Sequence, residues 1–118
     1  MFTGIVEETG EVAAFERTDE GRKLAVAGSV ATADLSVGDS LAVNGCCLTV
    51  SLLEDAKAWF DLLEETIACP SFESLQVGDR VNLERSLAAN GRMGGHFLSG
   101  HVDEAGKVTV FERRGENY

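Results

Sequence analysis

The stretch Asn44-Gly45-Cys46-Cys47-Leu48-Thr49-Val50-Ser51-Leu52 gives the strongest indication of fold in this 118-residue sequence. Its Asn-Gly pair tolerates the positive φ angles of a type I′ turn and therefore predicts a tight β-hairpin. The residues that follow alternate in character, as in a strand with two different faces. The apolar face, which we expect in a core, holds Cys46, Leu48, Val50 and Leu52. The other face holds Cys47, Thr49 and Ser51, which either meet water or line a ligand groove.

Turn signals of a similar kind recur on both sides of this hairpin. Asp19-Glu20-Gly21, Val37-Gly38-Asp39 and Val77-Gly78-Asp79 separate short stretches that are rich in Val, Leu, Thr and Phe. Such spacing is typical of an all-β domain, and six antiparallel strands are enough to close a small barrel. We expect strands at residues 4–15, 23–27, 40–43, 46–52, 59–63 and 80–83. We also expect a short helix at 64–69, which Pro70 ends, and a further helical turn at 31–35.

A gapless internal repeat links the two ends of the chain. Residues 3–17 align on residues 99–113 at an offset of 96, and eight of the fifteen pairs are identical, where chance gives about one. A complete second copy would extend well beyond Tyr118. We therefore expect a fragment of an internally duplicated protein, which stops after the first strand of its second copy. The expected domains are a first barrel at 1–90, a linker at 91–98 and the truncated start of a second barrel at 99–118.

Composition narrows the classes of function. The chain has 10 Lys and Arg residues against 20 Asp and Glu residues, and the resulting net charge of −10 repels nucleic acids and anionic membranes. No apolar run approaches the ~20 residues that span a bilayer, and no secretory leader is visible. The three cysteines include one adjacent pair but no C-x-x-C motif for zinc or redox chemistry. We expect a soluble cytoplasmic protein with reduced thiols, and neither a nucleic-acid nor a membrane partner.

Two further groups of polar residues are candidate sites. His96 and His101 are five residues apart, which puts them on opposite faces of an extended chain and argues against a shared metal. His96 fits a surface histidine, whereas His101 replaces the Ile5 of the first copy and hints at a function. Asp61, Glu64 and Glu65 form an acidic cluster that suits either a solvated face or the N-terminus of a helix.

Four motifs, in this order along the chain, together resemble the riboflavin synthase family. They are Met1-Phe2-Thr3-Gly4-Ile5-Val6, Asn44-Gly45-Cys46-Cys47-Leu48-Thr49-Val50, Gly78-Asp79-Arg80-Val81-Asn82-Leu83-Glu84 and Gly94-Gly95-His96-Phe97-Leu98-Ser99-Gly100-His101-Val102. Each motif is weak alone, but the four cover nearly the whole chain. The 96-residue repeat agrees independently with the two similar barrels of that family.

The resemblance implies a six-stranded Greek-key barrel that binds one 6,7-dimethyl-8-ribityllumazine. It also implies a homotrimer, in which the N-terminal barrel of one subunit faces the C-terminal barrel of a neighbour. In the family's reaction one lumazine donates a four-carbon unit to another, which gives riboflavin and 5-amino-6-(ribitylamino)uracil without a cofactor or metal. The implied ligand contacts are Phe2, Thr3, Gly4, Ile5, Val6, Cys47, Leu48, Thr49, Asp61, Leu62, Leu63, Glu64, Glu65, Thr66, Gly100, His101 and Val102.

For catalysis, the family's pattern points to Ser40, Cys47 and His101. Cys47 or Ser40 would supply or orient a nucleophile at C7 of the acceptor, and His101 would move a proton. Because the partner barrel is missing, we expect this chain to bind riboflavin or the lumazine with little or no turnover, and to form a homodimer. Two alternatives stay open: a non-catalytic lumazine- or flavin-binding protein with the same barrel, and an acidic barrel that serves only as an interaction partner.

Overall fold

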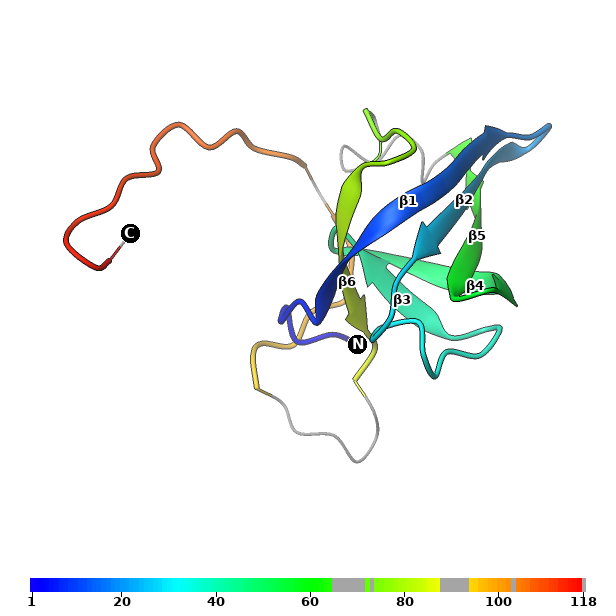
Figure 1. Ribbon diagram of the computed structural model, residues 1–118, viewed down its shortest axis with the longest axis horizontal. Helices are drawn as coiled ribbons and strands as arrows, with labels where there is room; N and C mark the ends of the chain where they lie inside the picture. Colours follow the sequence, from blue (N-terminus) through cyan, green and yellow to red (C-terminus); the bar gives the residue numbers. More distant parts are fainter. Residues whose placement is uncertain (65–71, 73, 88–93, 103, 118) are drawn as a thin grey trace.

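The computed structural model describes residues 1–64, 72, 74–87, 94–102 and 104–117. These residues form a closed barrel of antiparallel strands in the order β1-β2-β5-β4-β3-β6 (Figure 1). The strands are β1 (Glu8–Arg17), β2 (Gly21–Ala27), β3 (Ser40–Val43), β4 (Cys46–Glu54), β5 (Lys57–Leu63) and β6 (Arg80–Arg85). β1 pairs with both β2 and β6, which closes the sheet. The predicted fold class, an all-β six-stranded Greek-key barrel, is confirmed.

The inward-facing residues of the strands fill the barrel. Phe60, Leu24 and Leu41 lie at its centre, and each is at most 1% exposed. Phe72 joins this core from the segment before β6. Burying a side chain of this size contributes about 1.5–3 kcal/mol. Because a barrel this small is packed with its own side chains, a ligand has to bind on its outer surface.

The predicted alternation along β4 is confirmed for Leu48 and Val50, which are 5% and 1% exposed. It is wrong for Leu52, which is 48% exposed. The register of β4 against β5 shifts between Val50 and Leu52, so that Leu52 pairs with Trp59 and Leu53 with Ala58. A β-bulge inserts one residue, and every later residue then exchanges faces. Leu53 therefore packs against the core in place of Leu52.

The first strand begins later than predicted, at Glu8 rather than residue 4. Gly4 has a φ of +87°, which interrupts an extended strand. The expected helical turn at 31–35 is a hydrogen-bonded turn over residues 31–34, where the Ala33 N–H donates to the Val30 carbonyl at 3.3 Å. The expected helix at 64–69 lies outside the described residues, except for Glu64. No helix in the described ranges is long and apolar enough to cross a membrane.

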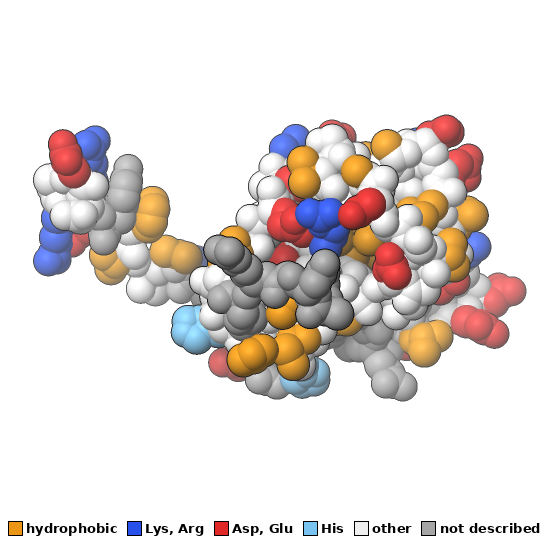
Figure 2. All heavy atoms as spheres, turned by 90° about the horizontal axis from the view of Figure 1, so that it is seen from below, with side chains coloured by type: hydrophobic (Ala, Val, Ile, Leu, Met, Phe, Trp, Pro, Cys, Tyr) orange, Lys and Arg blue, Asp and Glu red, His pale blue; other side chains and the backbone are white. Residues whose placement is uncertain are grey.

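The C-terminal part of the chain leaves the barrel. Residues 94–100 lie against it, and residues 101–102 and 104–117 run away from it as an extended arm (Figure 1). Figure 2 shows hydrophobic side chains along this arm and acidic side chains spread over the visible face of the barrel. Val108, Val110 and Phe111 on the arm are 71–79% exposed.

Candidate ligand-binding site

The candidate site is centred on a row of residues across β4, β3 and β6. Ala42 pairs with Cys47 on one side and with Glu84 on the other. Directly opposed residues point to the same face of a sheet. The neighbours Leu41 and Val43 point into the core, so this row lies on the outer surface of the barrel. Nevertheless Ala42 is only 4% exposed and Glu84 only 8%, because other parts of the chain cover them.

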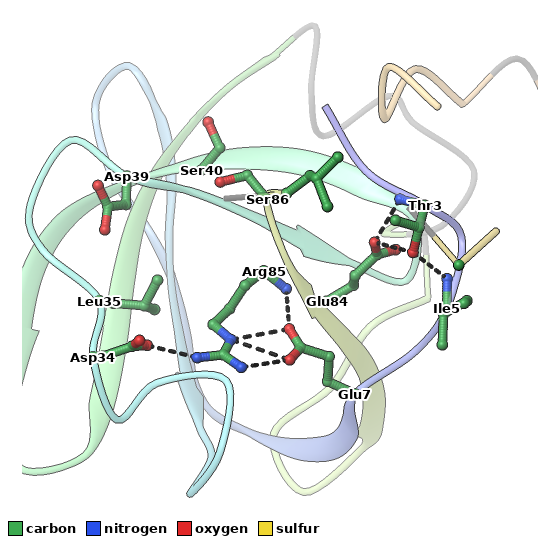
Figure 3. A pocket seen from close by; sticks show the side chains of 12 residues that line it. Thr3, Ile5, Glu7, Asp34, Leu35, Asp39, Ser40, Glu84, Arg85 and Ser86 are labelled. Carbon is green, nitrogen blue, oxygen red and sulfur yellow. Dashed lines mark hydrogen bonds and ion pairs between the residues drawn. The ribbon is translucent and has the colours of Figure 1, made fainter. Parts of the chain in front are cut away.

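One cover is the N-terminal segment, which the Glu84 carboxylate holds in place. The Thr3 N–H and hydroxyl donate to Glu84 Oε2 at 2.7 and 3.0 Å, and the Gly4 N–H donates to Oε1 at 3.1 Å. The Thr3 hydroxyl also accepts a bond from the Ile5 N–H at 3.1 Å (Figure 3). Hydrogen bonds to a charged acceptor are worth about 1.5–3 kcal/mol each. Glu84 therefore fixes the position of Phe2, Thr3 and Gly4 over β3.

The second cover is residues 94–100. Phe2 and Leu98 donate N–H groups to each other's carbonyls, both at 2.9 Å, and the His96 N–H donates to the Thr3 carbonyl at 2.9 Å. The Cys47 N–H donates to the Gly100 carbonyl at 3.0 Å. Gly100 lies so close that a Cβ there would be 2.6 Å from the Cβ of Cys47. The structure thus brings together Phe2, Cys47 and Gly100, although they are far apart in the sequence.

Ser40 lies two residues before Ala42 on the same outer face of β3. It pairs with Thr49 and lines a cleft of about 600 Å³, whose walls also include Thr3, Ile5 and Glu84 (Figure 3). Ser40 and Cys47 are diagonal neighbours across β3 and β4, a relation that corresponds to roughly 7–8 Å. His101 follows Gly100 and is exposed, at the start of the arm.

Charged side chains form the other wall of the cleft. Arg85 donates to both carboxylate oxygens of Glu7, at 2.6–3.1 Å, and to Asp34 at 2.9 Å (Figure 3). Its hydrogen bonds to Glu7 hold the pKa of that carboxyl below the ordinary 4.5, although burial opposes the shift. The pKa of Arg85 is raised, mainly by Glu7 and then by Asp34. The network ties β6 to the segment before β1 and to the 31–34 turn.

Comparison with known proteins shows which family the chain belongs to. Residues 3–86 match the family model described as the lumazine binding domain. The chain belongs to the lumazine binding domain family. Over 114 residues it is 48% identical to a riboflavin synthase of Bacillus amyloliquefaciens and 44% identical to one of Bacillus subtilis strain 168; each alignment covers 97% of this chain and 53% of the relative. The chain therefore spans about half the length of the curated relatives it matches.

Solved structures agree with this assignment. The lumazine-binding domain superimposes on LumP complexed with riboflavin with a TM-score of 0.78 and 28% identity, covering 88% of this chain and 56% of that one. It superimposes on LumP complexed with 6,7-dimethyl-8-(1'-D-ribityl) lumazine with a TM-score of 0.77 and 28% identity, covering 88% and 58%.

The remaining predicted contacts of the lumazine-binding domain lie on β4, on and just after β5, and in the two covering segments. Asp61, Leu63 and Glu64 are exposed, and Thr49 lies next to them because Val50 pairs with Phe60 at the adjacent position. The side chains of Leu48 and Leu62 point into the core and leave only backbone atoms for a ligand. Ile5 and Val6 are about half exposed, and Val102 is half-buried. Glu65 and Thr66 lie outside the described residues.

Sequence reasoning missed three residues that build this surface. These residues are Glu84, which ends one of the four motifs, Leu98, which falls in the predicted linker, and Arg85, which belongs to no motif. Alternation with the apolar Val81 and Leu83 indicates that Glu84 faces outward, yet nothing local indicates that it is buried. Its partners are about 80 residues away in the sequence, beyond the reach of any pattern within a strand.

Proposed function

We propose that this chain binds 6,7-dimethyl-8-ribityllumazine or riboflavin on the outer face of β5, β4, β3 and β6, and that it acts in riboflavin biosynthesis as part of a riboflavin synthase. The observation that carries the proposal is the meeting of Phe2, Cys47 and Gly100 on one face, beside the cleft that holds Ser40. These residues belong to the motifs that resemble riboflavin synthase. The similarity to LumP complexes with riboflavin and with the lumazine supports the same class of ligand.

The proposed reaction is a dismutation that needs no organic cofactor or metal. A base removes a proton from the C7 methyl of the donor lumazine, and the resulting anion delocalises into the pteridine ring. A nucleophile at C7 of the acceptor activates the second ring, and a four-carbon unit passes between the stacked rings to give riboflavin and 5-amino-6-(ribitylamino)uracil. Cys47 or Ser40 would supply or orient the nucleophile, and His101 would move a proton. Holding the two rings together is the main contribution of the protein.

Two rings need two binding surfaces, so a second barrel has to face this one. Phe2 and Leu98 are counterparts under the 96-residue offset, and each donates an N–H to the other's carbonyl at 2.9 Å. Two equivalent residues that exchange both bonds are related by a local two-fold axis, and this supports a symmetric pair of barrels. We propose a homotrimer for the full-length enzyme and a homodimer for this 118-residue chain, in the cytoplasm. Light scattering would give twice the chain mass; a trimer of the 118-residue chain contradicts this assembly.

Ligand titration tests the function. Riboflavin or the lumazine should bind with saturable quenching of ligand fluorescence, and Cys47→Ser, Ser40→Ala or His101→Gln should alter binding or residual turnover. Lys107→Gln, on the exposed arm, is the matched control and should leave both unchanged. The absence of saturable binding by the folded chain would refute the proposal.

A second candidate, a non-catalytic lumazine- or flavin-binding protein, is favoured by the likeness to LumP complexes. We expect little or no turnover from this chain alone because one barrel provides one binding surface. The two candidates are distinguished by a turnover assay on a full-length protein that contains both barrels. Riboflavin formation that Cys47→Ser and His101→Gln reduce supports the synthase. Tight binding without turnover supports the carrier.

A further inference from the structure

The internal repeat duplicates the residues that β1 needs to enter the barrel. A Cβ at Gly10 would lie 2.6 Å from the Ala27 carbonyl oxygen and 2.6 Å from Leu83 Cδ1, so only glycine fits there. Val12 is fully buried in the core. The Glu8 carboxylate accepts the N–H groups of residues 29–31 at 2.7–3.2 Å. All three residue types recur 96 positions later, as Gly106, Val108 and Glu104.

The same residues have no comparable use on the arm. A Cβ at Gly106 would meet nothing within 4 Å, and its φ is not in the left-handed region, so nothing in its surroundings requires glycine. Val108 is 77% exposed, and Glu104 is also exposed. The arm therefore has the residue types that the position of β1 requires, although it lies outside that position.

The start of the repeat already has the conformation of its counterpart. Gly4 and Gly100 have φ values of +87° and +85°. The Ile5 N–H donates to the Thr3 hydroxyl at 3.1 Å, and the His101 N–H donates to the Ser99 hydroxyl at 3.3 Å. In the first copy this conformation directs two N–H groups and a hydroxyl to Glu84. Ser99 and Gly100 contain the same set of donors.

The chain connection permits an exchange of the two segments. β6 runs antiparallel to β1, with Leu83 opposite Glu8, so a strand that follows β6 can return directly beside it. Leu98 already pairs with Phe2, and the His96 N–H reaches the Thr3 carbonyl. The segment that would enter thus lies against the segment that would leave.

We propose that residues 99–113 are a second β1, which can occupy the position between β2 and β6 in place of residues 3–17 of the same chain. In the exchanged form Ser99 and Gly100 bind Glu84, Glu104 accepts the N–H groups of the 29–31 turn, and Val108 enters the core. His101 then takes the place of Ile5 in the cleft that Ser40 lines. The exchange would thus replace the aliphatic side chain of Ile5 in the wall of the cleft by the imidazole of His101.

Three variants of the full chain test the exchange through their urea unfolding transitions. Gly106→Val should leave the transition unchanged, because the side chain has space on the arm. Gly10→Val blocks β1, yet the chain should keep a cooperative transition because the arm replaces that strand. The double variant should lose the transition. If Gly10→Val loses the transition as completely as the double variant, the exchange does not occur.

A disulfide trap tests the exchange without disabling β1. Glu11 pairs with Ala27 in the structure, and Lys107 is the counterpart of Glu11. In a chain whose native cysteines are replaced by serine, Ala27→Cys combined with Lys107→Cys should form an intramolecular disulfide on prolonged oxidation. Ala27→Cys with Glu11→Cys is the control for the β1 register. A folded chain that never forms the 27–107 bond, or forms it only between two chains, would overturn the proposal.

Discussion

Replacing Gly100 by alanine should detach residues 94–100 from the barrel while leaving the barrel folded. Gly100 has a φ of +85°, which side chains disfavour, and its added methyl group would lie 2.6 Å from Cys47 Cβ. Both atoms are Cβ atoms, which are bonded directly to the backbone, so no side-chain rotation relieves the contact. The segment has to move, and the Cys47–Gly100 hydrogen bond is lost first.

The size of the effect follows from the strain and from the bonds that resist detachment. Positive φ costs a residue with a Cβ about 1–2 kcal/mol, and overpacking costs about 1–3 kcal/mol. Four backbone hydrogen bonds hold the two covering segments to each other and to β4, and each contributes about 1 kcal/mol net. The loss cannot exceed what these contacts contribute, so we expect the free energy of unfolding to fall by about 2–4 kcal/mol.

The assay is urea unfolding followed by the fluorescence of Trp59, the one tryptophan of the sequence, which lies on β5. The matched control is Gly45→Ala, because Gly45 also has a positive φ, +81°, but a Cβ there would meet nothing within 4 Å. In the control, only the positive φ should lower the free energy of unfolding, by about 1 kcal/mol. Hydrogen exchange at the Leu98 amide should become fast in Gly100→Ala and stay slow in the control. Equal losses in the two variants, with Leu98 protected in both, would refute the close approach of Gly100 to Cys47.

Other perturbations separate the contributions of individual residues to folding. Glu8→Gln should lower the free energy of unfolding at pH 7 by about 1–2 kcal/mol, because three backbone N–H groups lose a charged acceptor. Burial is the largest single effect on the pKa of Glu8 and raises it. The hydrogen bonds from the N–H groups together outweigh burial, so the pKa is lowered from 4.5. A carboxylate with a lowered pKa stabilises the fold above its ordinary pKa and stops doing so as the pH falls. The loss of stability in Glu8→Gln should therefore shrink below about pH 4.5. A loss that does not depend on pH would contradict this account. Phe60→Ala should cost about 3–5 kcal/mol in urea unfolding, and Phe97→Ala, at a site that is 71% exposed, less than about 0.5 kcal/mol; similar losses would contradict the assigned core. Arg85→Lys should lose the paired contacts to Glu7 at a cost of about 0.5–1 kcal/mol, because both side chains are about one-third exposed, and this difference should disappear in 1 M salt.

The strands were predictable because their requirements are local. The Asn-Gly pair and the Gly-Asp turns fix where the chain reverses, and β3 was predicted at the bounds observed. The errors arise where a distant partner overrides the local pattern. Gly4 lies outside β1, with a φ of +87° and its N–H bound to Glu84, and Leu52 leaves the core because β4 shifts its register against β5. A period-two pattern contains no information about either partner.

The candidate site was less predictable from the residues alone. Alternation placed Cys47 and Thr49 outside the core but could not distinguish a solvated surface from a ligand groove. The resemblance to a family supplied Ser40, Cys47 and His101 as a set, and the structure brings Cys47 to Gly100 and places Ser40 in the adjacent cleft. The burial of Glu84 was not predictable, because a glutamate at the end of a strand is normally exposed to water. Its burial exists only after residues 1–5 have folded across β3.

The outer location of the site has a consequence for how function depends on folding. The core residues determine whether the barrel forms, but the surface proposed to bind the ligand is completed by two covering segments, held by the Glu84 contacts and a few backbone bonds. The residues that make these contacts are not part of the hydrophobic core cluster, so the contacts can break while the barrel persists. Ligand affinity should therefore be more sensitive than barrel stability to changes at Glu84 and Gly100. In a series of variants at these two positions, affinity should fall before the cooperative unfolding of the six strands is lost, whereas variants at Phe60 should lose both together.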